Sequence, residues 1–181
     1  MAIKPTIYKF RISLSDLNRN YYETLNLTVA LHPSETTERM MVRVLAYCVN
    51  AQEQLSFTKG LSEAAQPDIW VRSYDEKITL WIDVGEPSIE RIKKSCHLAE
   101  TVKIYCFNSK ADVWWKQSQG KISQLKASVI KFDWPEIQHL ASLVERTMDM
   151  SVSISGDSAY VATALGECEL NWQVLQDLRF N

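Results

Sequence analysis

Hydrophobic and polar residues alternate over several stretches of the chain, and this alternation predicts β-strands. The first stretch is "TIYKFRISLSD", which a turn over Asp16–Asn20 connects to "YYETLNLTVAL", so a hairpin opens the sequence. A second hairpin is predicted within "PDIWVRSYDEKITLWIDVGEP", and further strands over "TVKIYCFN" and "LKASVIKFDW". The closing segment, "MSVSISGDSAYVATALGECELNW", predicts two or three short strands around Gly156 and Gly166.

Apolar residues recur at helical spacing in four segments between these strands. The first, "HPSETTERMMVRVLAYCVNAQ", has Ser34 as its predicted N-cap. The others are "PSIERIKKSCHLAE", "SKADVWWKQSQGKISQ" and "PEIQHLASLVERTM", the last opened by Pro135. Helices placed between strands form crossovers, so the order predicts an α/β protein with a mixed β-sheet core and flanking helices. It leaves open a second, small antiparallel sheet formed by the terminal strands.

Length and composition are those of an ordinary globular protein. The 181 residues predict a single domain over residues 1–181, with an apolar fraction of 46% and a charged fraction of 23%. No apolar run approaches the ~20 residues of a membrane span, and the first ten residues lack the apolar region of a signal peptide, so we expect a cytoplasmic protein without membrane contact. The net charge of −2 argues against a globally basic nucleic-acid binder and leaves room for a local basic patch.

Two aspartates are predicted to face each other in the central hairpin. With the turn centred after Asp75, strand pairing places Asp68 opposite Asp83 on one face, with Cβ atoms about 4.5–5.5 Å apart. Such a pair stays ionised only beside a cation, and hard divalent cations prefer carboxylate oxygens, so Mg²⁺ or Mn²⁺ is the predicted guest. The alternative is a three-residue turn, which shifts the register by one and leaves both aspartates as solvated strand ends.

Several short motifs also occur in the order found in a known protein family. They are "HPSET" (32–36), "RM" (39–40), "FTKGL" (57–61), "WIDVGEP" (81–87), "RIKKSC" (91–96) and "WW" (114–115). By these motifs the chain resembles the YaeQ family, a bacterial family whose fold is a variant of the restriction-endonuclease fold. Pro67-Asp68 followed by Asp83 likewise resembles the metal-binding motif of PD-(D/E)XK nucleases. The resemblance implies a restriction-endonuclease-like variant with a nuclease-like site.

The chain departs from the nuclease motif at one position. The motif has a lysine two residues after its second acid, where this chain has Gly85. In variants of the fold that lysine can lie on the following helix, which makes Lys93 and Lys94 catalytic candidates. The helical wheel places Lys93 beside the apolar stripe, facing the sheet, and Lys94 nearer to solvent. Either lysine is alternatively a surface residue whose stem covers apolar area.

Glu35 and Glu38, near the start of the first helix, are candidates for completing the metal site. Glu35 belongs to the "HPSET" match, and Glu38 lies at the edge of the apolar stripe one turn later. Both also have a simpler explanation, because acidic residues near a helix N-terminus complement the helix dipole.

Two functions follow from these observations. The first is a Mg²⁺-dependent phosphodiesterase acting on nucleic acid, with Asp68 and Asp83 holding the metal and a lysine offsetting developing charge. The second is a non-catalytic module that lost this chemistry with the lysine at position 85. Its surface, including Trp114 and Trp115, would bind protein or nucleic acid.

Overall fold

The structure is a computed structural model that describes residues 4–59, 61 and 63–178. The chain divides into two compact units. The first comprises Met1–Val49 with Asp133–Trp172, and the second comprises Asn50–Phe132 with Gln173–Asn181. Each unit combines helices with a mixed sheet, so the predicted mixed α/β class is confirmed. The single domain over residues 1–181 stays a prediction. Within the described part of the chain, no helix has the length and apolar character needed to cross a membrane.

The first unit holds five strands and two helices. Its elements are β1 (Thr6–Asp16), β2 (Tyr21–Leu31), α1 (Thr37–Val49), α4 (Trp134–Ser142), β8 (Thr147–Ser155), β9 (Ser158–Thr163) and most of β10 (Gly166–Gln176). The strand order is β2-β1-β8-β9-β10. The predicted opening hairpin is confirmed, since β1 and β2 pair antiparallel from Thr6↔Leu31 to Asp16↔Tyr21.

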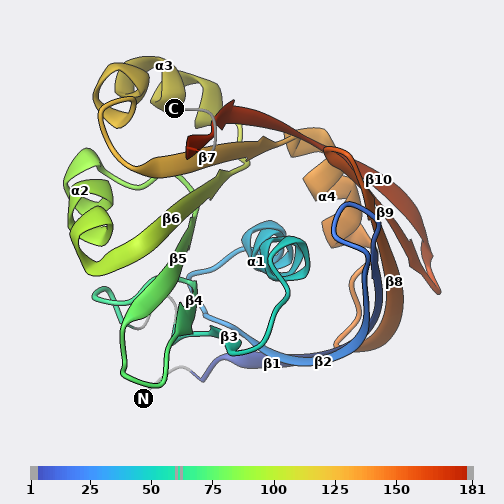
Figure 1. Ribbon diagram of the computed structural model, residues 1–181. Coiled ribbons are helices and arrows are strands. Elements are labelled where there is room, and N and C mark those ends of the chain that lie inside the picture. Colours follow the sequence, from blue (N-terminus) through green and yellow to red (C-terminus); the bar gives the residue numbers. More distant parts are fainter. Residues whose placement is uncertain (1–3, 60, 62, 179–181) are drawn as a thin grey trace. The chain divides into compact units, whose positions relative to one another are not determined.

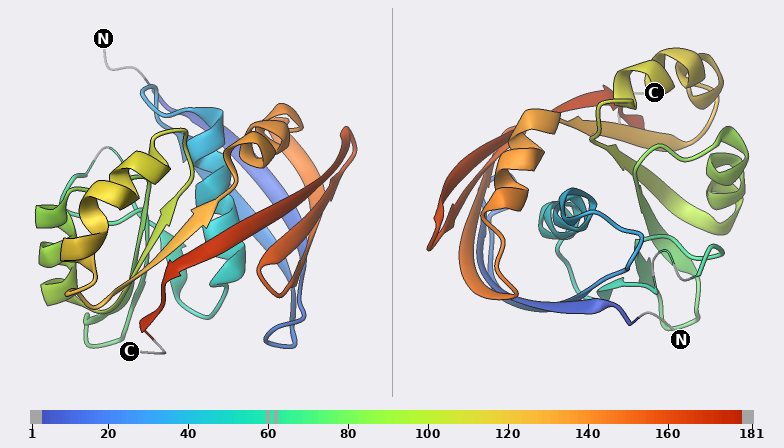
Figure 2. Two further views of the ribbon diagram at one scale, coloured as in Figure 1. Left: turned by 90° about the horizontal axis from the view of Figure 1, so that it is seen from above. Right: turned by 180° about the vertical axis from the view of Figure 1, so that it is seen from behind.

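The sheet formed by the terminal strands differs from the small antiparallel sheet considered above. Its five strands belong to one ten-stranded sheet of the described residues, and β1 runs parallel to β8 from Lys9↔Thr147 to Asp16↔Ile154. Alternate residues of β1 and β8 are buried, as the alternation predicts. In Figure 2 both helices of this unit lie on the concave side of its curved sheet, where they cover the buried side chains.

The first helix begins later than predicted. α1 starts at Thr37, and the Thr36 hydroxyl accepts a hydrogen bond from the Arg39 N–H at 3.2 Å. Ser34 is therefore not the N-cap. Its own N–H donates to His32 Nδ1 at 3.1 Å, and its hydroxyl lies 2.7 Å from the same nitrogen. Ser34 and Thr36 are both residue types that can cap a helix. Ser34 is used in the local turn with His32, so Thr36 supplies the capping hydroxyl.

The second unit carries the central hairpin. Its elements are β3 (Leu55–Phe57), β4 (Ile69–Arg72), β5 (Ile78–Val84), α2 (Ile89–Leu98), β6 (Ala99–Cys106), α3 (Ala111–Ile122), β7 (Ala127–Phe132) and the last residues of β10. The strands follow the order β10-β7-β6-β5-β4-β3. β3, β4 and β5 pair antiparallel, whereas β5, β6 and β7 are parallel and connected through α2 and α3.

Both crossover helices cover the same face of the parallel strands (Figure 1). Parallel strands joined by right-handed crossovers in one direction along a sheet place their helices on one side. Ile92 of α2 and Ile122 of α3 are fully buried in one cluster with Trp81, Ile104 and Val129 of β5, β6 and β7. This shared core fixes α2 beside the end of β5, where Asp83 lies.

Candidate functional site

The β4–β5 hairpin has the predicted register near the two aspartates. Ile69 pairs with Ile82 and Trp70 with Trp81, as predicted, and Asp68 directly precedes the first of these pairs. The Asp68 N–H donates to the Ile82 carbonyl at 3.0 Å. The two carboxyl groups interact electrostatically, and Asp68 is only 5% and Asp83 only 3% exposed. The juxtaposition is therefore confirmed, and the alternative of solvated strand ends is not.

The turn of this hairpin reaches the register by a different route. Ser73–Lys77 form a five-residue loop closed by Ser73 N–H donating to the Lys77 carbonyl at 2.8 Å, with Glu76 at a φ of 64°. A register shift between Val71 and Arg72 then absorbs one residue, so that Arg72 lies opposite Ile78. A β-bulge of this kind adds a residue to one strand and restores the pairing beyond it.

Asp68 is bound by backbone at the end of the neighbouring strand. Its Oδ2 accepts a hydrogen bond from the Val84 N–H at 2.8 Å. The backbone carbonyl of Asp68 accepts the Thr58 N–H at 3.1 Å. The side chain thus tethers the end of β5 to the start of β4, which is a structural role.

Asp83 is paired with Arg91, in the first turn of α2. Arg91 Nε donates to Oδ2 at 2.9 Å and Nη2 donates to Oδ1 at 3.1 Å, so the guanidinium engages both carboxylate oxygens. The same guanidinium donates to the carbonyls of Ala64 at 2.7 Å and Gln66 at 2.9 Å. Arg91 therefore supplies the cation that two neighbouring carboxylates require.

Burial outweighs this pairing in setting the protonation of Asp83. Loss of solvent raises the pKa of its carboxyl group, and the charge of Asp68 adds to the increase. The hydrogen bonds and charge of Arg91 act in the opposite direction without cancelling it. Within the described part of the chain, the Trp81 Nε1–H has no hydrogen-bond partner of ordinary geometry, yet the indole lies close enough to Asp83 to lower the same pKa slightly. The net direction is upward, because the desolvation of the carboxylate is the largest contribution.

Glu35 and Glu38 lie in the first unit, away in the sequence from the aspartates of the second. Glu35 is bound by two arginines: Arg39 Nη1 donates to Oε2 at 2.6 Å, and Arg43 donates to both oxygens at 2.6 and 2.9 Å. Arg43 also donates to the Ala30 carbonyl at 2.9 Å, so this buried network fastens α1 to β2. Glu38 is half-buried in the first turn of α1, where its charge complements the helix dipole.

Both candidate lysines are exposed on α2. The prediction that Lys93 faces the sheet is wrong, because Ile92 and Ser95 are the buried residues of that helix. The Ser95 hydroxyl donates to the Ile92 carbonyl at 2.9 Å and so satisfies itself within the helix. The pattern of large apolar residues did not indicate that the polar Ser95 is buried. Its burial shows that the sheet-facing side of α2 is centred away from Lys93.

A divalent cation does not fit the two aspartates in this arrangement. Both oxygens of Asp83 already accept from Arg91, and Oδ2 of Asp68 accepts from Val84. Among residues 4–59, 61 and 63–178, no group of three or more His, Cys, Asp or Glu side chains is placed to hold a metal ion. Arg91 was missed by sequence reasoning. The available signal was an arginine in the first turn of the helix that follows the strand carrying Asp83.

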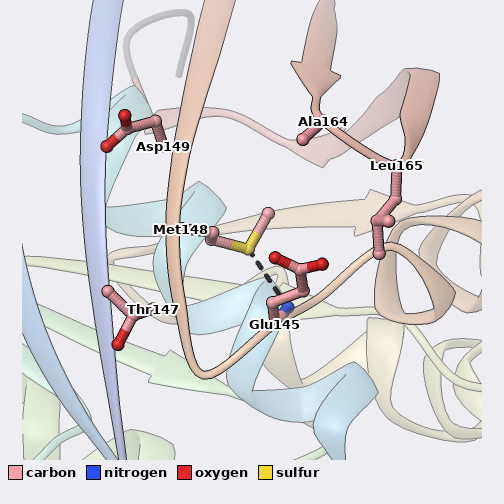
Figure 3. A pocket seen from close by; sticks show the side chains of 6 residues that line it. All are labelled: Glu145, Thr147, Met148, Asp149, Ala164 and Leu165. Atoms are coloured by element: carbon pink, nitrogen blue, oxygen red, sulfur yellow. Dashed lines mark hydrogen bonds between the residues drawn. The ribbon is translucent and has the colours of Figure 1, made fainter.

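A pocket of about 290 Å³ lies elsewhere, in the first unit. Figure 3 shows its lining by two carboxylates, Glu145 and Asp149, and by four other residues, Thr147, Met148, Ala164 and Leu165. The Glu145 N–H donates to Met148 Sδ at 3.3 Å. None of the predicted site residues lines this pocket, so it and the aspartate pair are separate features of the molecule.

Comparison with known proteins assigns the family. The family model described as "YaeQ protein" matches residues 1–172. The chain belongs to the YaeQ family. The uncharacterized YaeQ proteins of Salmonella typhi and Escherichia coli K12 are 40% and 39% identical to it over 178 residues, which is 96% of this chain and 98% of each relative.

Two crystal structures of YaeQ proteins share the family's fold with this chain. The protein from Xanthomonas axonopodis pv. citri superimposes with a TM-score of 0.92 at 33% identity, covering 95% of this chain and 98% of that one. The protein from Pseudomonas syringae gives a TM-score of 0.92 at 35% identity, covering 97% and 98%. These names state a family and no activity.

Proposed function

We propose that this YaeQ family member is a non-catalytic binding protein, built on a restriction-endonuclease-like variant of the α/β fold. The observation that carries the proposal is the contact between Arg91 and both oxygens of Asp83. A metal-dependent phosphodiesterase needs its acidic pair for a metal ion, whereas here an arginine neutralises it. The acidic pair then serves the fold, by tying α2 to β5.

The basic residue of the nuclease motif gives a second argument. Gly85 stands where the motif has its lysine, and the candidates on the following helix, Lys93 and Lys94, both point to solvent. A cation that offsets charge on a scissile phosphate has to be held next to the metal ligands. Arg91 is next to Asp83, but its guanidinium is committed to that carboxylate and to two backbone carbonyls.

A Mg²⁺- or Mn²⁺-dependent phosphodiesterase acting on nucleic acid is the second candidate. The opposed, buried carboxylates of Asp68 and Asp83 favour it, because like charges are rarely placed together without a use. This candidate requires Arg91 to release Asp83. Under this function, Glu35 and Glu38 act as further metal ligands only if they leave their present positions in the first unit, where Glu35 binds Arg39 and Arg43.

Metal-dependent melting separates the two candidates. A metal that binds only the folded protein raises its melting temperature. We expect Mg²⁺ and Mn²⁺ to leave the melting temperature of the wild type unchanged. Mn²⁺ should raise the melting temperature of Arg91→Met, because two buried carboxylates have lost their cation in this variant. Asp75→Asn is the matched control, since it removes an exposed carboxylate from the same hairpin.

The contrary result is equally clear. A Mn²⁺-induced increase in the wild type that disappears in Asp83→Asn would show a metal site, and the binding-protein proposal would be overturned. Cleavage of DNA or RNA by the wild type with Mn²⁺, again abolished by Asp83→Asn, would establish the phosphodiesterase.

A further inference from the structure

Positive charge is concentrated in one segment of this acidic chain. Residues 88–126 contain eight lysines and arginines against three acidic residues, a net charge of +5, whereas the whole chain has a net charge of −2. The segment comprises α2, β6 and α3 with their connections. A local excess of this size produces a positive potential that the overall charge conceals.

Six of these cations are lysines with exposed side chains on or beside the two crossover helices. We call them the α2–α3 lysine face: Lys93, Lys94, Lys110, Lys116, Lys121 and Lys126. The other two members of the segment are used internally, since Arg91 holds Asp83 and Lys103 donates to Asn50 at 2.7 Å. No ion pair between residues of the described ranges involves any of the six lysines.

The helices present these lysines on one side of the second unit. On α2 the exposed positions 90, 93, 94 and 97 follow the helical period, which aligns Lys93, Lys94 and His97 along one stripe with a single acidic residue, Glu90. α2 and α3 lie on the same face of β5, β6 and β7 and share one core, as Figures 1 and 2 show. The helical layer and its connections therefore carry six exposed lysines, together with the exposed acidic residues Glu90 and Asp112.

The acidic residues of the same segment oppose this surface weakly. Asp112 of α3 is paired with Lys131 of β7, so its charge is already compensated within the protein. Glu90 and Glu100 are the remaining acids. The six exposed lysines thus outnumber the two remaining acidic residues, so they are available to bind an external anion.

We infer that the α2–α3 lysine face binds the phosphate backbone of double-stranded nucleic acid. The inference rests on the proposed binding function and specifies its partner. Nucleic acid duplexes carry closely and regularly spaced negative charges, which several separated lysines can contact together. Lysine is a flexible point charge, and it contacts phosphates without reading the bases. Binding is therefore independent of sequence.

The tryptophans of α3 point to a duplex partner in preference to a single strand. Single-strand binding relies on exposed aromatic rings that stack on bases. Trp114 and Trp115 are half-buried, and Trp114 Nε1 donates to the Pro87 carbonyl at 3.0 Å, which holds its ring in the protein. The lysine face offers charge without a stacking platform.

Fluorescence anisotropy with labelled random-sequence DNA and RNA duplexes tests this inference. The measurements are made in EDTA across a salt series, so that no metal contributes. We expect affinity to fall steeply with salt, with log K changing by about −0.9 per log unit of salt for each phosphate contact. Replacing Lys93, Lys94, Lys116 and Lys121 by glutamine should reduce the slope by about three to four and weaken binding at least tenfold, on the order expected from four lost contacts.

The control removes the same charge from elsewhere. Lys4, Lys9, Lys59 and Lys77 are exposed lysines outside the face, and their joint replacement by glutamine should leave the salt slope unchanged. Equal losses in both quadruple variants would overturn the inference, because only net charge would then matter. Absence of duplex binding by the wild type at low salt, or stronger binding to anionic lipid vesicles than to duplexes, would also overturn it.

The two proposals fail separately. The anisotropy experiment contains no divalent metal. A negative result would therefore overturn the nucleic-acid partner and would not affect the proposal that Arg91, and not a metal ion, neutralises Asp83. A metal-induced increase in the melting temperature of the wild type would instead overturn the non-catalytic function, and the measured contribution of the lysine face to binding would stand. Melting curves of both quadruple variants confirm that each is folded.

Discussion

Arg91 explains how two buried carboxylates exist side by side. Its guanidinium contacts Asp83, the carbonyls of Ala64 and Gln66, and the ring of Trp81, whose centroid lies 5.9 Å from Arg91 Cζ. The Arg91 side chain is 34% exposed, so its charge retains water on one side. The proximity of the two aspartates was predictable from alternation, although the turn between their strands differs from the predicted one. The arginine was not, because its role depends on the approach of a helix to a strand.

Asp83→Asn should therefore destabilise the protein. The amide keeps one acceptor oxygen and sets an NH₂ group against the donors of Arg91. We expect the free energy of unfolding at neutral pH to fall by about 1–2 kcal/mol, the size of hydrogen bonds to a charged group, reduced for the partial exposure of Arg91. Urea unfolding measures it. Asp75→Asn, at an exposed position, should leave the free energy of unfolding nearly unchanged. Equal stability of the two variants would contradict the structural role of Asp83.

The pH dependence of this effect has a definite sign. The pKa of Asp83 is raised in the folded protein, so the folded state binds a proton more readily than the unfolded chain. The proton-linked part of the contribution of Asp83 to stability is then greatest below its unfolded pKa of about 3.8 and is lost as pH rises through the folded value, which leaves the hydrogen bonds to Arg91 as its contribution at neutral pH. We expect the stability of wild type relative to Asp83→Asn to increase between pH 7 and pH 4. A decrease over that range would show that Arg91 outweighs burial.

At the scale of single elements, the hairpin and α2 show what the sequence specifies. The tryptophan pair of β4 and β5 was predicted in register, since alternation fixes which residues share a face. The bulge after Val71 was not predicted, because it depends on a positive φ at Glu76 that no residue type there demands. The buried side of α2 was misassigned for the same kind of reason, since Ser95 is buried although it is polar.

The N-cap of α2 is predicted to stabilise the helix that carries Arg91. The Ser88 hydroxyl accepts a hydrogen bond from the Arg91 N–H at 3.2 Å. Ser88→Ala leaves this N–H without its partner and should reduce the free energy of unfolding by about 1 kcal/mol. Ser88→Thr or Ser88→Asp keeps an acceptor and should restore most of the loss. If Ser88→Ala melts like the wild type, the first turn is held by the Arg91–Asp83 contact alone.

At the scale of the whole molecule, long-range pairing lay beyond prediction. The order of helices and strands followed from periodicity and turn residues, and it is confirmed for the central segment. The parallel pairing of β1 with β8 joins Lys9 to Thr147, and no local pattern specifies which distant strand is chosen. The division into two units likewise depends on such pairings.

The two units are predicted to unfold together. The chain passes between them after Val49, after Phe132 and after Trp172, within the strand β10 in the last case. Burial raises the pKa of the Cys48 thiol in the first unit, and of the Cys106 thiol in the second, to about 12. Both thiols should resist alkylation near neutral pH, where the reactive thiolate is scarce.

Alkylation followed by mass spectrometry along a urea series measures this cooperativity. We expect Cys48 and Cys106 to become reactive at the same urea concentration, as a single domain over residues 1–181 requires. Cys96 is half-buried and serves as the internal control, since it should react before either of them. Separate midpoints for Cys48 and Cys106 would show two independently folding units.

Gly85 has a consequence for how this sequence can change by descent. Its φ is +112°, and its N–H donates to the Tyr105 carbonyl at 2.8 Å, so the backbone is fixed in a conformation that side chains with a Cβ rarely adopt. Space for a Cβ exists, because nothing lies within 4 Å of its position. A mutation to lysine would still cost about 1–3 kcal/mol of backbone strain. A change to lysine at this codon is therefore opposed by the backbone itself, and a lineage carrying this loop gains a basic residue beside Asp83 more easily from another part of the chain.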